Sequence, residues 1–217
     1  MMLNLFSVFD PATGLFSLNW LSMLLFLFLP TPFWKTPGKL LSILINMNIK
    51  ITKEVIMHTK TLKPTVLLVS MLLYILMINV TGLLPYVFTA SAHLSVSLSI
   101  ALTMWTSLML YGWFNSTNKM FTHLVPLGTP SPLMPFMVMI ESISNVIRPG
   151  SLAVRLSANM IAGHLLMSLL GNNLTVYPAL MMMMMWLFMS LMVFELAVAF
   201  IQSYVFMTLS TLYSSEI

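Results

Sequence analysis

The sequence lacks cysteine and contains little charge, and these two features exclude several classes of protein. With no Cys among 217 residues, disulfides, iron–sulfur clusters and thiol chemistry are excluded. Only 6% of the residues are charged, against about 25% in a typical soluble domain. In contrast, 59% are hydrophobic and the mean hydropathy is +0.97, so we predict an integral membrane protein.

Two further absences concern metal sites and targeting. The four His residues stand in separate segments, so no metal-ligand spacing is present, and we predict no metal and no cofactor. Residues 1–34 contain no Lys or Arg, which argues against a secretory n-region and against an Arg-rich mitochondrial transit peptide. We therefore expect no cleaved segment.

Several apolar runs are long enough to cross a bilayer, and they lack the alternation of barrel strands. They predict an all-α integral membrane protein, one membrane domain over residues 1–217 with about five membrane helices and a surface amphipathic helix. The last two helices, at roughly 55 Å each against a hydrocarbon core of about 30 Å, are expected to be steeply tilted and antiparallel. The predicted spans cover residues 15–29, 65–88, 94–114, 132–170 and 176–212.

Two short motifs predict where the first of the two long helices bends and where the chain turns between them. Pro149-Gly150 predicts a bend in the first helix, and Gly171-Asn172-Asn173 predicts the turn between them. Simple antiparallel register about that turn places Arg155 opposite a position near 189. An approach of His164 to Glu195 would then need stagger or strong tilt.

Six of the nine Lys and Arg residues fall between residues 35 and 63. The apolar residues among them follow a helical stripe, which predicts an amphipathic helix over 38–62 in the membrane surface; a solvated loop is the alternative. By the positive-inside rule this side faces the matrix or the cytoplasm. Counting spans places the C-terminus on this basic side and the N-terminus on the opposite side.

One permanently charged side chain, Arg155, lies inside an apolar helix long enough to span the membrane. An arginine at the middle of a membrane helix costs about 2.5 to 3.5 kcal/mol on insertion scales. The guanidinium cannot avoid this cost by losing its proton. Such a residue predicts a functional site.

Other polar side chains form two rows around this arginine. At 100° per residue, four of them share one broad face with Arg155, whereas His164 falls about 180° from it. On the last long helix, Glu195 and Gln202 are about two turns apart and form a second row. The four residues on the shared face are Glu141, Asn145, Arg148 and Asn159.

Each polar residue also has a structural alternative. Glu141 and Arg148 are spaced for an intrahelical charge pair. The amide side chains are also consistent with hydrogen bonds between packed helices, and His164 with a buried histidine whose hydrogen bonds are satisfied. Arg155 and Glu195 favour a functional role most strongly. Burying either charge in hydrocarbon costs free energy without an evident structural return.

The segments ESISNVIRPGSLAVRLSANMIAGHLL and FELAVAFIQSYVFMTL resemble subunit a of the F-type ATP synthase in its mitochondrial form. Asn79 with TGLLPYVF, and the order of segments over essentially the whole chain, are similar to that family. The 23 Met residues, including the run from Met181 to Met185, resemble an organelle-encoded invertebrate protein. The resemblance implies a multi-pass protein of the mitochondrial inner membrane, with its N-terminus on the intermembrane-space side and its C-terminus on the matrix side.

The resemblance also implies a function. In that family the arginine that matches Arg155 faces the carboxylates of a rotating ring of c subunits and separates two aqueous proton half-channels. His164 and Glu195 are then expected to line the uptake half-channel, with Gln202 near the arginine and Glu141 on the release path. Arg148 is not carried over. The expected proton-pathway residues are Arg155, His164, Glu195, Gln202, Glu141, Asn159 and Asn145.

The implied partners are the c-ring, the peripheral stalk, other ATP synthase membrane subunits and the lipid bilayer, with no nucleic acid. The chain itself is expected to be non-catalytic. One alternative is an ion-coupled secondary transporter, for which inverted repeats are expected, and no convincing repeat is found. Another is a proton-pumping subunit of a respiratory complex, for which buried Lys residues are expected, whereas here the Lys residues cluster at the surface.

Overall fold

The computed structural model describes residues 5–12, 17–28, 36–59, 63–84, 87–125, 130–174 and 181–216. All regular secondary structure in these residues is helical, which confirms the predicted all-α class. The helices, with η marking the 3-10 type, are η1 (Leu5–Phe9), η2 (Leu18–Phe28), α1 (Lys39–Thr59), α2 (Lys63–Gly82), η3 (Ala90–Ala92), α3 (Leu94–Asn115), α4 (Thr117–Leu124), η4 (Ser131–Leu133), α5 (Met134–Leu174) and α6 (Met181–Glu216).

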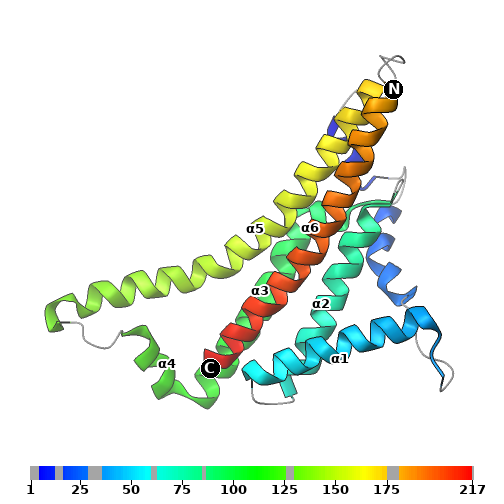
Figure 1. Ribbon diagram of the computed structural model, residues 1–217. Helices are drawn as coiled ribbons and strands as arrows, with labels where there is room; N and C mark the ends of the chain where they lie inside the picture. Colours follow the sequence, from blue (N-terminus) through cyan, green and yellow to red (C-terminus); the bar gives the residue numbers. More distant parts are fainter. Residues whose placement is uncertain are drawn as a thin grey trace.

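Two long helices, α5 with 41 residues and α6 with 36, form an antiparallel hairpin through the molecule (Figure 1). This pair confirms the two long antiparallel helices predicted for the C-terminal half. The helix α5 changes direction, since its first part extends outward from the bundle above α4 and its second part rises beside α6 (Figure 1). Pro149 lies inside α5, where its missing N–H and its ring disturb the preceding turn, and this is the physical reason for a bend.

The turn predicted at Gly171-Asn172-Asn173 is wrong, because α5 remains helical through Leu174. These residues have local turn preferences, but a Gly within a helix costs only about 1 kcal/mol relative to Ala, which by itself does not end a long helix. The predicted boundaries at residues 15, 29, 62 and 176 lie outside the described residues. So do residues 85–86 of the predicted span 65–88.

Four of the described helices are long and apolar enough to cross a membrane: α2, α3, α5 and α6. The described part of the predicted first span forms η2, an 11-residue 3-10 helix that packs beside α2. At about 2.0 Å per residue it extends roughly 22 Å. A fifth crossing in this region stays a prediction.

The core joins α2, α3, α5 and α6 around one buried cluster. Leu152 and Leu156 of α5 pack there with Ile75, Ala101 and Phe206 from the other three helices. Burial of apolar side chains stabilises a helix contact by about 25 cal/mol per Å², although in lipid the gain comes from packing rather than from exclusion of water. This cluster fixes the turns of α5 on either side of Arg155, which itself remains outside the core.

The basic segment forms the helix α1, not the alternative loop. Its second half joins the bundle through Val55, which is 1% exposed and packs with Leu68 of α2 and Met207 of α6. In its first half, Ile43 and Met47 are exposed. Figure 1 shows α1 lying across the lower ends of α2 and α6. That α1 lies in the membrane surface stays a prediction.

The segment between α3 and α5 contains the eight-residue helix α4 (Thr117–Leu124). Phe121 of α4 meets Trp113 of α3 edge to face, with ring centroids 5.0 Å apart. This aromatic contact holds the short helix against the end of α3.

Candidate functional site

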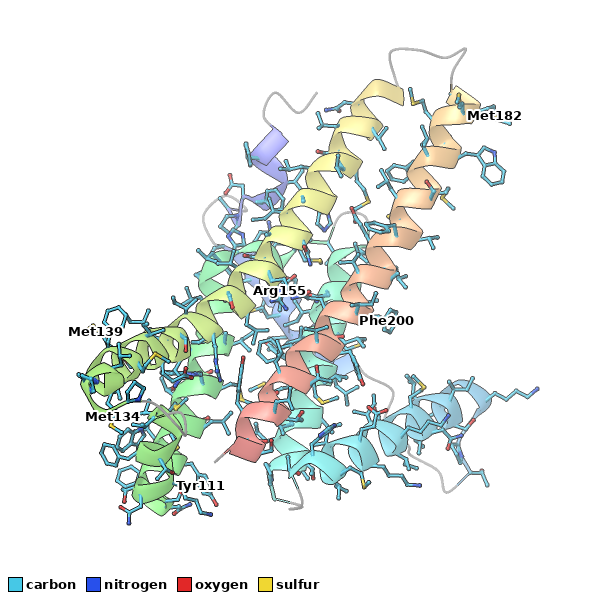
Figure 2. The ribbon with its side chains drawn as sticks, turned by 60° about the vertical axis from the view of Figure 1, so that its left-hand side comes forward. Tyr111, Met134, Met139, Arg155, Met182 and Phe200 are labelled. Atoms are coloured by element: carbon cyan, nitrogen blue, oxygen red, sulfur yellow. The ribbon has the colours of Figure 1, made fainter. Side chains whose placement is uncertain are left out.

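The arginine that the sequence singles out lies near the middle of the α5–α6 hairpin (Figure 2). Arg155 is exposed, and among the described residues it has no carboxylate partner. Its neighbours on the same side of α5 are also exposed, and they are small: Ser151, Ala158 and Ala162. Small side chains allow another helix to approach closely, so this side of α5 presents one fixed cation on a surface that a helix can contact.

Three contacts define the register of the hairpin. Asn159 Nδ2 donates a hydrogen bond to Gln202 Oε1 at 3.3 Å. The Arg148 guanidinium lies 5.3 Å from the centroid of the Tyr213 ring. Gly163 faces the side chain of Glu195.

For each of these three pairs, the mean of the two residue numbers lies near 180. The sequence placed the turn near residue 172 and Arg155 opposite a position near 189, and this register is wrong. Because α5 continues past Gly171, the hairpin closes later in the chain, and His164 and Glu195 come to the same level without additional stagger.

Glu195 is the most deeply buried of the predicted acidic residues, with 8% of its surface exposed. Neither carboxylate oxygen has a hydrogen-bond partner among the described residues. The side chain lies over Gly163, where a Cβ atom would stand only 2.6 Å from Glu195 Cδ. A buried carboxylate without a partner is costly, so it has the character of a functional group rather than of a packing residue.

Glu195 also lines a groove of about 260 Å³ between α5 and α6. Asn159 and Leu166 of α5 and Phe194 of α6 form part of its wall. The Asn159–Gln202 hydrogen bond lies on the side of this groove toward Arg155. Glu195, Asn159 and Gln202 are therefore brought together along the seam of the hairpin, and Gln202 is 5% exposed.

His164 faces a different cavity. It lines a space of about 620 Å³ between α5, α6 and the N-terminal segments, together with Asp10 and Asn19. Its ring meets Phe9 edge to face at a centroid distance of 6.3 Å. The imidazole Nε2 is buried and has no hydrogen-bond partner among the described residues. His164 and Glu195 thus lie at one level of the hairpin but line two separate cavities, with Gly163 between them.

Glu141 and Arg148 form the intrahelical pair that the sequence allowed, at 3.6 Å, with side chains 38% and 33% exposed, respectively. An ion pair this exposed contributes at most about 1 kcal/mol to the free energy of unfolding. Asn145 lies between them on α5 and is half-buried. These three residues lie in the first part of α5, well before His164 along the helix.

The structure adds two residues that sequence reasoning missed as site residues, Asp10 and Gly163. Asp10-Pro11 signalled only a turn, and Gly163 sits beside His164 without any pattern that marks it. Over the described parts of the chain, no three His, Cys, Asp or Glu side chains gather as metal ligands would. The available chemistry is therefore proton exchange at His164, Asp10 and Glu195 beside one fixed cation.

Comparison with known proteins gives one consistent result. Residues 15–215 match the family model described as ATP synthase A chain. A relative from Locusta migratoria, named ATP synthase subunit a, is 52% identical, and the match covers 100% of both chains. Relatives with the same name from Anopheles quadrimaculatus and Drosophila melanogaster are each 51% identical, again over 100% of both chains.

Proposed function

Because this chain belongs to the ATP synthase A chain family, as a proton-translocating subunit a of the F-type enzyme, we propose that Arg155 separates two proton half-channels. The matches confirm the family resemblance of the sequence and give no support to a secondary transporter or a respiratory proton pump. The insect relatives agree with the mitochondrial form of the family. With its four apolar helices, the chain is a multi-pass inner-membrane protein.

The observation that carries the proposal is the position of Arg155. Its guanidinium is exposed on an apolar helix and has no carboxylate partner among the described residues, so its counter-charge is supplied by another chain. The small side chains beside it admit a neighbouring helix. A ring of c subunits, each carrying a carboxylate on a helix, fits both requirements.

Arg155 performs two tasks in this arrangement. A fixed cation favours the ionised form of a carboxylate that passes it, so the carboxylate releases its proton before it moves on. The same cation repels protons that would cross directly between the half-channels. Proton flow is then coupled to movement of the ring. A neutral side chain in place of Arg155 would neither favour the ionised carboxylate nor repel protons.

The uptake half-channel is assigned to the two cavities beside Gly163. A proton reaches His164 through the larger cavity and passes to Glu195 across the seam, where Gly163 leaves room for the carboxylate. Imidazole and carboxylate groups take up and release protons readily, which suits a relay. From Glu195 the groove leads toward Asn159 and Gln202, which lie next to Arg155 in the hairpin.

The release half-channel is assigned to the other end of α5. Glu141 is its acidic group, and Asn145 lies between Glu141 and Arg155 on the helix. The 3.6 Å contact with Arg148 leaves Glu141 partly exposed and therefore able to exchange a proton with solvent. Arg148 positions Glu141 and has no role of its own in proton transfer.

Orientation follows from the basic helix α1. Its Lys39, Lys50 and Lys53 are exposed, and a segment rich in lysine favours the matrix side. The C-terminal part of α6 packs against α1, so the C-terminus lies on the matrix side as well. The helix η1 packs against α5 near the opposite end of the hairpin, which supports an N-terminus on the intermembrane-space side. The chain breaks no covalent bond itself and works with the c-ring, the peripheral stalk and the other membrane subunits.

The test is Arg155→Ala in the assembled ATP synthase. We expect ATP synthesis driven by an imposed proton gradient to be abolished, while the amount of assembled complex is unchanged and passive proton leak rises. Lys119→Ala, which removes one exposed cation from α4, is the matched control and is expected to behave as wild type. Normal proton-driven synthesis by assembled Arg155→Ala complexes would overturn the proposal.

A further inference from the structure

His164 lines a cavity of about 620 Å³. Its walls come from five parts of the chain: the N-terminal segment, η2, the residues after α2, α5 and α6. Among its lining side chains the two titratable groups are Asp10 and His164. The other elements contribute groups that do not titrate, such as Asn19 of η2, Phe88 and Met192.

Asp10 is held in place at the exposed side of this cavity. One carboxylate oxygen, Oδ1, accepts a hydrogen bond from the Ala12 backbone N–H at 3.0 Å. Asn19 donates from Nδ2 to the Asp10 backbone carbonyl at 3.4 Å, which ties η2 to the same segment. The second oxygen, Oδ2, has no partner among the described residues and remains available to a proton.

The segment that carries Asp10 packs against the histidine. Phe9, one residue earlier, packs edge to face on the His164 ring, so the segment that carries Asp10 is anchored to α5 at this point. Asp10 is exposed, whereas His164 is half-buried, and both line one continuous space. The cavity therefore leads from an exposed carboxylate to a partly buried imidazole.

We propose that Asp10 is the proton-collecting group of the uptake half-channel and that Asn19 is a positioning residue that holds the Asp10 segment at the cavity. This inference rests on the proposed function. A proton from the aqueous phase binds the Asp10 carboxylate and passes to the His164 imidazole, so the carboxylate returns to its ionised form and no other reactant is consumed.

Electrostatics sets the size of the effect. Clefts lined by one sign of charge raise the on-rate of a counter-ion by about 10- to 1000-fold, and a single carboxylate belongs at the lower end of that range. Salt screens such attraction over about 8 to 10 Å at physiological ionic strength. The contribution of Asp10 is therefore largest when protons are scarce and salt is low.

Asp10→Asn is the decisive variant, because Asn keeps the acceptor for the Ala12 N–H and removes only the charge. In the assembled complex at low salt, we expect a 3- to 10-fold lower rate of proton-driven ATP synthesis when the uptake side is neutral or alkaline. At acidic pH on that side the rate should equal that of wild type. The difference should shrink in high salt, and Asp10→Glu should restore the wild-type profile.

Glu54→Gln is the matched control, since it removes an exposed carboxylate of α1 at the other end of the molecule. An unchanged pH profile in Asp10→Asn would overturn the inference. So would an equal loss at every pH together with less assembled complex, because that pattern reports a structural role.

Arg155→Ala in the same preparation separates the two proposals. If Arg155→Ala abolishes synthesis and Asp10→Asn has no effect, only the role of Asp10 is refuted. If assembled Arg155→Ala complexes synthesise ATP normally, the proposed function itself is refuted.

Discussion

Placing a methyl group at Gly163 tests the proposed proton relay at the point where Gly163 faces Glu195. A Cβ on this residue would stand 2.6 Å from Glu195 Cδ and 3.1 Å from Cγ. Carbon atoms pack favourably at about 3.5 to 4.0 Å, so the carboxylate must move by about 1 Å in Gly163→Ala. The atoms that must move form the end of a flexible side chain, and the stability cost should lie near the lower end of the roughly 1 to 3 kcal/mol of an overpacked site.

Function should suffer more than stability. A misplacement of about 1 Å in a reacting group can lower a rate by about 100-fold, so we expect proton-driven ATP synthesis in Gly163→Ala to fall by about 10- to 100-fold. The assay is ATP synthesis by purified complexes in sealed vesicles under an imposed proton gradient. Rates are divided by the amount of assembled complex, which should stay close to that of wild type.

Two variants sharpen this test. Gly150→Ala adds the same methyl group to the same helix at a position with no heavy atom within 4 Å, and it should leave synthesis unchanged. Glu195→Asp in the Gly163→Ala background shortens the side chain by one methylene and should recover part of the activity. If Gly163→Ala retains synthesis within twofold of wild type, the position of the Glu195 carboxylate does not limit proton transfer, and the reasoning is refuted.

His164→Ala and Glu195→Gln should each slow proton uptake far more than assembly, because each removes an exchangeable proton site while the hairpin contacts remain. If proton flux is unchanged when both side chains are replaced, the two residues only contribute to packing. Asn159→Leu removes the donor of the 3.3 Å hydrogen bond and leaves the buried Gln202 carbonyl unsatisfied. This change should cost about 1 to 3 kcal/mol and lower the inactivation temperature of the purified complex, with partial recovery in Asn159→Leu/Gln202→Leu. If the double variant shows no recovery of the inactivation temperature, the Asn159–Gln202 hydrogen bond does not couple the two helices.

The sequence was sufficient for the fold class and for the anomaly at Arg155. Long apolar runs can only be helices in a membrane, and a charge inside one of them stands out without any coordinates. It was not sufficient for the hairpin register. Gly171 and the two Asn residues after it each cost a helix only about 1 kcal/mol or less relative to Ala, and α5 continues through them to Leu174.

The cavities could not be predicted for a different reason. Asp10 and His164 are far apart in the chain, and only the docking of Phe9 and η2 brings them to one space. A helical wheel shows that His164 and Arg155 lie on different sides of α5, but it does not show what each side meets. The role of Gly163 is invisible for the same reason, since it depends on the residue that faces it across the seam.

The exposure of Arg155 has a consequence for biogenesis. A copy of this chain that sits alone in lipid carries the arginine uncovered, at a cost of about 2.5 to 3.5 kcal/mol. That cost corresponds to a factor of roughly 70 to 400 in favour of the copy whose arginine is covered by a partner. The residue that we propose to couple proton flow to rotation would therefore also mark an unassembled subunit as incomplete, by a free-energy difference that membrane quality control can use.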